Sequence, residues 1–299
     1  MQNALPQRRG ILEQTLARPS SKLAFGLLLL ICAAALFLPL FLQTEPHATS
    51  ANTFLSPNAA HPFGTDLNGR DVLSRTLQGA RISIAVGFSG AMVSLLIGTS
   101  IGLIAGYCGG ALDALLMRIV DVLYSVPRLI LIILANFVFD PVLSGWLANF
   151  QKGIWIGYSK ILILILALGC IEWLTMARIV RGQVLSLKTL PFIQAALALG
   201  QSHPKILTRH LLPNLSGIII VYLTLTIPAV MLDESFLSFL GLGVQPPQAS
   251  WGSLLSDGAQ ALNPVESHWW LLAFPAACMS LTLLALNFIG DAMRDALAK

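Results

Sequence analysis

Four ionisable side chains interrupt the apolar stretches of this sequence and are its first candidates for chemistry. Lys160 and Glu172 lie within one apolar run, and Asp233 and Glu234 are adjacent at the end of another. A carboxylate pair acting as acid and base needs facing side chains, whereas neighbours on a helix diverge by about 100°. Lys160 and Glu172 lie roughly 18 Å apart along a helix, so they cannot pair directly.

The sequence contains no recognisable catalytic constellation. It has no Walker-type phosphate loop, no His-Glu-x-x-His, no Cys-x-x-Cys and no Gly-x-Ser-x-Gly. His203 and His210 have no acidic or cysteine companion at ligand spacing, which favours polar loop or capping roles. The cysteines have no paired spacing and are interpreted as buried thiols: Cys32, Cys108, Cys170 and Cys278. We therefore expect no enzyme active site, metal, disulfide or cofactor.

The composition excludes a water-soluble globule. Of the 299 residues, 56% are hydrophobic and only 11% are charged, whereas soluble domains carry about 25% charged residues. Lipid must replace the missing polar surface. The net charge of +4 is small and dispersed, which argues against nucleic acid as a partner.

Apolar runs of roughly 20 residues, the length needed to cross a bilayer, predict an all-α polytopic membrane protein with about six transmembrane helices. In the second, Gly98 and Gly102 would let a neighbouring helix approach closely. Asp140-Pro141 should end the third, and Pro228 should kink the fifth. The first is too long for a signal peptide and is interpreted as retained. The predicted spans are 23–42, 82–107, 122–139, 154–177, 215–232 and 270–289.

The distribution of Lys and Arg predicts the orientation. Of the 18 such residues, the segments on the N-terminal side of the membrane hold thirteen, counting Arg118 and Arg128. The opposite segments hold four, and Lys160 lies within a span. This excess predicts that both termini are cytoplasmic. Asp233 and Glu234 would then lie at the outer end of the fifth span, one facing a water-filled cavity and the other the outer interface.

The polar cytoplasmic loop 178–214 contains a short predicted helix. Pro191 suits its first turn, Thr189 could cap it, and Gly200 suits a left-handed position at its end. A helix of about 13 Å is too short to cross a membrane. Its alanines, Ala195, Ala196 and Ala198, give it a slim profile. It could dock in a groove on another protein or lie on the lipid surface, and spacing alone leaves both open.

The residues Gln194-Ala195-Ala196, followed by Gly200 and by Leu212-Pro213, resemble the EAA loop of ABC-importer permease subunits. The family pattern begins with Glu, whereas this chain has Gln194. The substitution removes a charge but keeps a hydrogen-bonding side chain of similar length.

Other stretches are similar to the peptide/nickel branch of these permeases, and within it to the C subunits of oligopeptide permeases. The resemblance covers about residues 20–297, and the Gly-Leu-Gly-Val-Gln-Pro-Pro and Ser-Trp-Gly blocks are specific. The loop 140–153 looks longer than is usual in this family. The stretches are His61–Arg75, Gly106–Gly110, Trp173–Gln183, Leu237–Gly252 and Asn287–Leu297.

The resemblance implies a type I ABC importer permease fold in the bacterial inner membrane. It implies a homologous B-type permease partner, two cytoplasmic ATP-binding subunits that hydrolyse ATP, and an extracytoplasmic peptide-binding protein. The helix within 190–200 would then be the coupling helix that contacts an ATPase. Its implied contact residues are Gln194, Ala195, Ala196, Leu197, Gly200, Pro204, Arg209 and Pro213.

The predicted organisation has a cytoplasmic tail (1–22), a first transmembrane helix (23–42) and a periplasmic loop (43–81). A core permease domain of five transmembrane helices (82–290) contains the coupling loop (178–214), and a second cytoplasmic tail follows (291–299). Ionisable residues at membrane depth are functional candidates, so Asp233, Glu234 and Glu172 are candidates for the pathway or gate. For Glu172, a structural interhelical role remains equally open.

Three rival functions follow from the same sequence. The same machinery could carry dipeptides, nickel chelates or other small solutes instead of oligopeptides. An intramembrane enzyme would need facing carboxylates in the bilayer, and none is apparent. A self-sufficient channel would conduct without ATPases.

Overall fold

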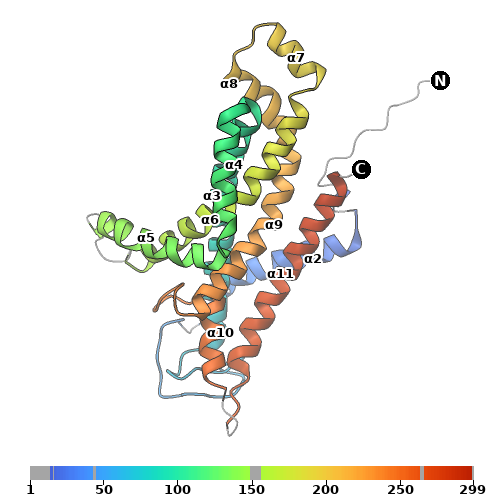
Figure 1. Ribbon diagram of the computed structural model, residues 1–299. Helices are drawn as coiled ribbons and strands as arrows, with labels where there is room; N and C mark the ends of the chain where they lie inside the picture. Colours follow the sequence, from blue (N-terminus) through green and yellow to red (C-terminus); the bar gives the residue numbers. More distant parts are fainter. Residues whose placement is uncertain (1–13, 16, 43–44, 149–155, 263–265, 298–299) are drawn as a thin grey trace, which may run out of the picture.

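The computed structural model describes residues 14–15, 17–42, 45–148, 156–262 and 266–297, and this part of the chain is predominantly helical (Figure 1). Five helices are long and apolar enough to span a membrane, or six spans if one bent pair counts as one. The long helices are α2 (Pro19–Phe37), α3 (Val72–Cys108), α6 (Ile156–Leu187), α9 (Leu212–Phe239) and α11 (Trp270–Leu297). The shorter ones are α4 (Gly110–Ser125), α5 (Arg128–Ala148), α7 (Pro191–Ala198), α8 (His203–Ile206) and α10 (Trp251–Gln260), with a 3₁₀ turn (Leu38–Leu40) and a π-helical turn (Leu207–Leu211).

Helix α3 begins ten residues before the predicted span. Asp71 caps it, because its side chain accepts a 2.8 Å hydrogen bond from the backbone N–H of Ser74. The 37 residues of α3 extend for about 55 Å, well beyond the ~30 Å hydrocarbon core of a bilayer. The helix therefore projects from the membrane.

Glycines of α3 bring it against α6. A Cβ added to Gly98 would lie 2.6 Å from the Cβ of Met176, and one added to Gly102 would lie 2.6 Å from the carbonyl oxygen of Ala177. Such separations leave no room for any side chain at either position. The predicted close approach at Gly98 and Gly102 is confirmed, and α6 is the neighbour.

The third span is not the single helix that the sequence predicted over 122–139. Helices α4 and α5 meet at an angle of 102°. The break lies at Val126, whose backbone is extended (φ −91°, ψ 135°), because a residue before proline is disfavoured in the helical region. In Figure 1, α5 extends sideways from the bundle of α3, α4 and α6.

The expected stop at Asp140-Pro141 was also wrong, since α5 continues through Pro141 to Ala148. Apolar helices tolerate an internal proline when neighbouring groups satisfy the freed carbonyl. Helix α9 likewise continues through Pro228. Part of the loop 140–153 and the predicted start of the fourth span at 154 lie outside the described residues.

An ion pair joins the start of α2 to the end of α11. Nη1 of Arg18 lies 2.7 Å from Oδ2 of Asp295, so the two ends of the described chain lie on one side of the molecule. Much of α2 is exposed and apolar, including Leu29 and Leu30, a surface suited to lipid or to another subunit.

Candidate functional site

Helix α7 forms one end of the molecule, together with α8 (Figure 1). Pro191 occupies its first turn, as the sequence predicted. Leu190 is the N-cap residue and provides no side-chain cap. The expectation that Thr189 caps the helix was wrong, because its hydroxyl instead donates to the carbonyl of Ser186 at 2.9 Å.

Gly200 ends α7 in the left-handed conformation, with φ of +72°. The N–H of Gly200 donates to the carbonyl of Leu197 at 2.9 Å, and the N–H of Gln201 donates to that of Ala196 at 3.1 Å. These two bonds form a Schellman motif, which needs a residue that tolerates positive φ. The prediction for Gly200 is confirmed, and its cause is backbone conformation, because a Cβ there would meet nothing within 4 Å.

One member of the predicted contact set, Ala196, is not exposed. Ala196 is buried and packs with Ile193 in an apolar cluster that includes Val184, Ile206 and Leu211. Because Ile193 and Ala196 are three residues apart, both side chains lie on the same face of α7, the face that packs against the rest of the chain. Leu199, which the sequence analysis did not select, is 81% exposed. The exposed members of the predicted set are Gln194, Ala195, Leu197, Gly200, Pro204, Arg209 and Pro213.

The side chain of Gln194 makes a hydrogen bond within the same loop. Its Nε2 donates a 2.8 Å hydrogen bond to the carbonyl of Lys188. The two histidines of the loop have neutral polar partners: Tyr107 contacts His203 at 2.6 Å, and Gln201 contacts His210 at 2.8 Å. A groove of about 600 Å³ runs beside α7, between Tyr107, Lys188, Gln194 and Pro204.

Arg128, at the start of α5, joins two of the three candidate pathway residues. Its Nη2 lies 2.7 Å from Oε1 of Glu172 on α6 and also pairs with Oδ2 of Asp233 on α9. The side chain of Arg128 is 45% exposed, whereas the side chains of Glu172 and Asp233 are largely buried. Two carboxylates share one cation, so the group carries an excess negative charge when both are ionised. A cavity of about 330 Å³ adjoins Arg128 and Glu172.

This contact corrects the predicted position of Arg128. Arg128 was predicted in an inner segment and Asp233 at the outer end of a span, but two residues in contact cannot lie on opposite sides of a membrane. The cause is α4, which begins at Gly110 and carries the chain about 24 Å along the bundle before Arg128.

Glu234 is enclosed by its own chain, unlike Asp233. Its side chain has 0% exposure. Its carboxylate accepts hydrogen bonds from Ser83 at 3.0 Å and from Ser238 at 2.7 Å. The hydroxyl of Ser83 in turn accepts a bond from the N–H of Trp251 at 3.1 Å. Glu234 therefore joins α3, α9 and α10, and the expectation that it faces a cavity or the outer interface was wrong.

Sequence reasoning missed a polar ladder that joins α6 to α4 and to the start of α5. Every third residue of α6 from Glu172 to Arg181 has a partner on the preceding segment, and this spacing of three is the signal that could have revealed a shared face. The pairs are Arg181–Asp113 (2.5 Å), Arg178–Asp121 (2.6 Å), Thr175–Tyr124 (2.6 Å) and Glu172–Arg128 (2.7 Å). The guanidinium of Arg178 also lies 4.0 Å from the centre of the Tyr124 ring.

Helix α4 is held to α6 mainly by this ladder. Only Asp113 and Val120 of α4 are buried. Gly109, the N-cap residue, and Gly110, the first residue of the helix, both have positive φ, and the extended Val126 follows the helix. The helix therefore has a bend at each end and long polar side chains along one side.

Comparisons with known proteins identify related chains. Residues 98–299 match the family described as "Binding-protein-dependent transport system inner membrane component". The chain is 46% identical over 237 residues to the oligopeptide transport system permease protein OppC of Haemophilus influenzae, covering 79% of this chain and 70% of that protein. It is 42% identical over 279 residues to the dipeptide transport system permease protein DppC of Bacillus subtilis, covering 89% and 81%. OppC of Escherichia coli is 44% identical over 239 residues, covering 80% and 72%.

A solved structure has the same fold. A chain from inward-facing structures of the MetNI methionine ABC transporter matches with a TM-score of 0.55 and 19% identity, over 75% of this chain and 95% of that one. At this identity the match concerns the fold alone, which is that of a type I importer permease.

Proposed function

The chain belongs to the family of binding-protein-dependent transport system inner membrane components, and we propose that this permease subunit of an ABC importer carries oligopeptides. The similarity to permeases named for oligopeptide transport supports this cargo, and the similarity to DppC, named for dipeptide transport, supports the first alternative. Dipeptides, nickel chelates and other small solutes are the alternative cargoes of the same machinery.

We propose α7 as the coupling helix that contacts an ATP-binding subunit. The helix lies at one end of the molecule, and its outward residues include small and apolar side chains such as Ala195, Leu197 and Leu199. Its inward residues, Ile193 and Ala196, fix it to the ends of α6 and α9 through a shared apolar cluster. A displacement of α7 by the ATPases would therefore move both spans.

The ladder extends this route to the pathway. Helix α6, which ends just before α7, carries Arg181 and Arg178, and these pair with α4. The last rung is Glu172 with Arg128, which also contacts Asp233. We propose that movement of α6 relative to α4 and the start of α5 changes this cluster of three charges, which acts as a gate within the membrane-spanning part. In this mechanism the permease has two discrete conformations, and nucleotide binding to the ATPases shifts the equilibrium between them.

The proposed assembly contains a homologous B-type permease, two cytoplasmic ATP-binding subunits and an extracytoplasmic peptide-binding protein. The peptide passes between the two permeases, so this chain lines half the pathway and contributes no catalytic site. In the proposed orientation, α7 and both termini are cytoplasmic, in a bacterial inner membrane.

Purification and transport assays test this function. The tagged chain is purified from its native membrane, and we expect a second permease and ATP-binding subunits to co-purify. The reconstituted complex, supplied with ATP and binding protein, should import labelled pentapeptides. Import of dipeptides or nickel chelates without pentapeptides would contradict the oligopeptide proposal, and flux through the isolated chain without ATPases would contradict the coupled mechanism.

A further inference from the structure

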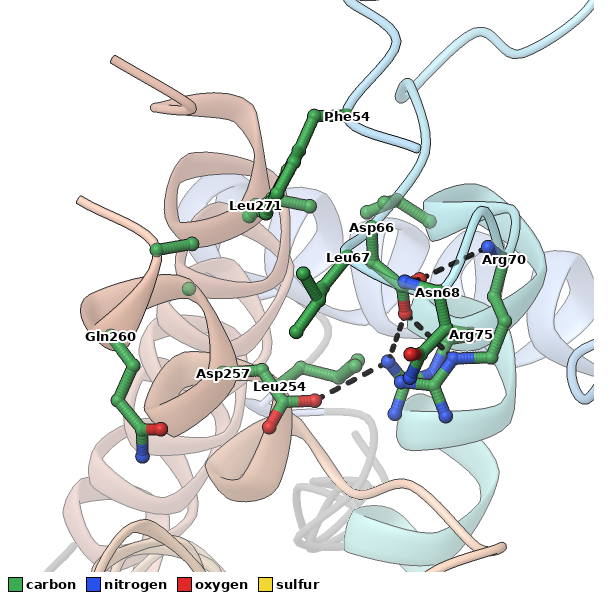
Figure 2. A pocket seen from close by; sticks show the side chains of 13 residues that line it. Phe54, Asp66, Leu67, Asn68, Arg70, Arg75, Leu254, Asp257, Gln260 and Leu271 are labelled. Atoms are coloured by element: carbon green, nitrogen blue, oxygen red, sulfur yellow. Dashed lines mark hydrogen bonds and ion pairs between the residues drawn. The ribbon is translucent and has the colours of Figure 1, made fainter. Parts of the chain in front are cut away.

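A cavity of about 360 Å³ lies at the end of the molecule opposite α7, between the segment 54–75, helix α10 and the start of α11 (Figures 1 and 2). It combines polar and apolar walls. In the proposed orientation it faces outward, on the side from which cargo arrives.

A rigid ion-pair network forms one wall. Asp66 accepts hydrogen bonds from Nε of Arg70 at 2.7 Å and from Nη1 of Arg75 at 2.6 Å. It also accepts bonds from the backbone N–H groups of Asn68 and Arg70. The carboxylate of Asp66 therefore has its acceptor positions filled, and it fixes both guanidinium groups at the cavity (Figure 2).

Arg75 keeps unused donors although its side chain is only 7% exposed. Both of its ion pairs use Nη1, to Asp66 and, at 3.3 Å, to Asp257. Within the described parts of the chain, its Nε and Nη2 groups have no hydrogen-bond partner. Arginine has five N–H donors in a planar fork that matches a carboxylate. Unused donors of a buried guanidinium on a cavity wall are a ready site for a ligand carboxylate.

Asp257, on α10, is the complementary group. Its side chain is 51% exposed, and its contact with Arg75 at 3.3 Å is its one ion pair among the described residues. It can therefore accept a ligand's ammonium group without breaking a fixed network. With two arginines and two aspartates, the cavity walls are neutral overall, which suits a ligand that carries both charges.

The remaining walls are apolar. Phe54, Leu254 and Leu271 line the cavity, and they suit an aliphatic side chain. Small-molecule sites have volumes of roughly 300–1,000 Å³, so this cavity is at the small end of that range.

We propose that this cavity binds an apolar α-amino acid or dipeptide as a zwitterion, with the carboxylate on Arg75 and the ammonium on Asp257. The site lies apart from the Arg128 cluster and does not rest on the cargo proposal. Binding could therefore persist in an importer that carries another solute.

Calorimetric titration of the purified complex in lipid nanodiscs tests the site. The ligands are Leu-Leu, its N-acetylated form and its C-terminal amide. We expect saturable binding of Leu-Leu and a loss on the order of tenfold or more for each blocked form, since each lacks one charge-assisted contact. Asp257→Asn should cause a similar loss. Asp291→Asn, which removes an exposed carboxylate elsewhere, on α11, should leave binding unchanged.

The results of these titrations distinguish binding in this cavity from binding at the Arg128 cluster. Absence of saturable binding, or equal affinity for the blocked ligands or for Asp257→Asn, would overturn the proposal. So would binding that is lost in Arg128→Gln but kept in Asp257→Asn, because the ligand would then occupy the Arg128 cluster. Thermal unfolding of each variant checks that the fold is kept. A complex that binds Leu-Leu here but imports no peptide would reject the cargo proposal alone.

Discussion

Nη2 of Arg128 lies 2.7 Å from Oε1 of Glu172, and this contact joins the start of α5 to the middle of α6. The Glu172 carboxylate therefore has an interhelical partner, and it also borders a cavity. Arg128, Glu172 and Asp233 thus form an interhelical contact, and we propose that the same three residues act as the gate.

The Arg128 cluster should behave as one coupled unit. Arg128→Gln leaves the Glu172 and Asp233 carboxylates without their cation, so we expect lower thermal stability and loss of ATP-driven uptake. A double-mutant cycle of Arg128→Gln with Glu172→Gln should give a coupling free energy of about 1–2 kcal/mol. Additive effects in thermal unfolding would contradict the pairing.

Substitutions of the adjacent residues Asp233 and Glu234 should have different effects on uptake and on stability. Asp233→Asn removes the excess negative charge of the Arg128 cluster. Uptake of cationic peptides should then fall by about tenfold relative to neutral ones, the equivalent of one charge contact. Glu234→Gln should leave this preference unchanged and lower stability, because Glu234 accepts bonds from buried serine hydroxyls. Competition assays with lysyl and neutral peptides measure the difference, and an equal shift for both variants would place Glu234 on the pathway.

Peptide uptake should require Gly200 because of the positive φ of its backbone. Gly200→Trp and Gly200→Val place a side chain at a φ of +72°, which costs roughly 1–2 kcal/mol and destabilises the Schellman motif. We expect both variants to assemble but to lose most peptide uptake. Gly200→Asn is the matched control, because asparagine tolerates this conformation. Normal uptake by Gly200→Trp would refute the coupling role of α7.

Gln194→Glu tests the departure from the family pattern. A carboxylate cannot donate the bond that Gln194 makes to the carbonyl of Lys188. Loss of about 1 kcal/mol should lower the hydrogen-exchange protection of α7 by roughly fivefold. Gln183→Glu, at an exposed position on α6, serves as the control. Unchanged protection in Gln194→Glu would show that this bond does not hold the helix.

The sequence alone determined features that depend on local chemistry. Long apolar runs predicted most spans, because the length needed to cross a bilayer is fixed. Pro191 and Gly200 predicted the bounds of α7, because each restricts or permits particular backbone angles at its own position. Gly98 and Gly102 predicted a close helix contact without indicating α6 as the partner.

Only the tertiary structure decided which distant residues meet. Arg128 approaches Asp233 because the chain bends by 102° after α4, a bend that the predicted single span over 122–139 did not include. Glu234 is enclosed and Asp233 is not, because neighbouring residues on one helix face different elements, and the docking of α3 and α10 determines which face is covered. Ala196 turns inward for the same reason. Such pairings depend on how whole helices pack, which no short stretch of sequence specifies.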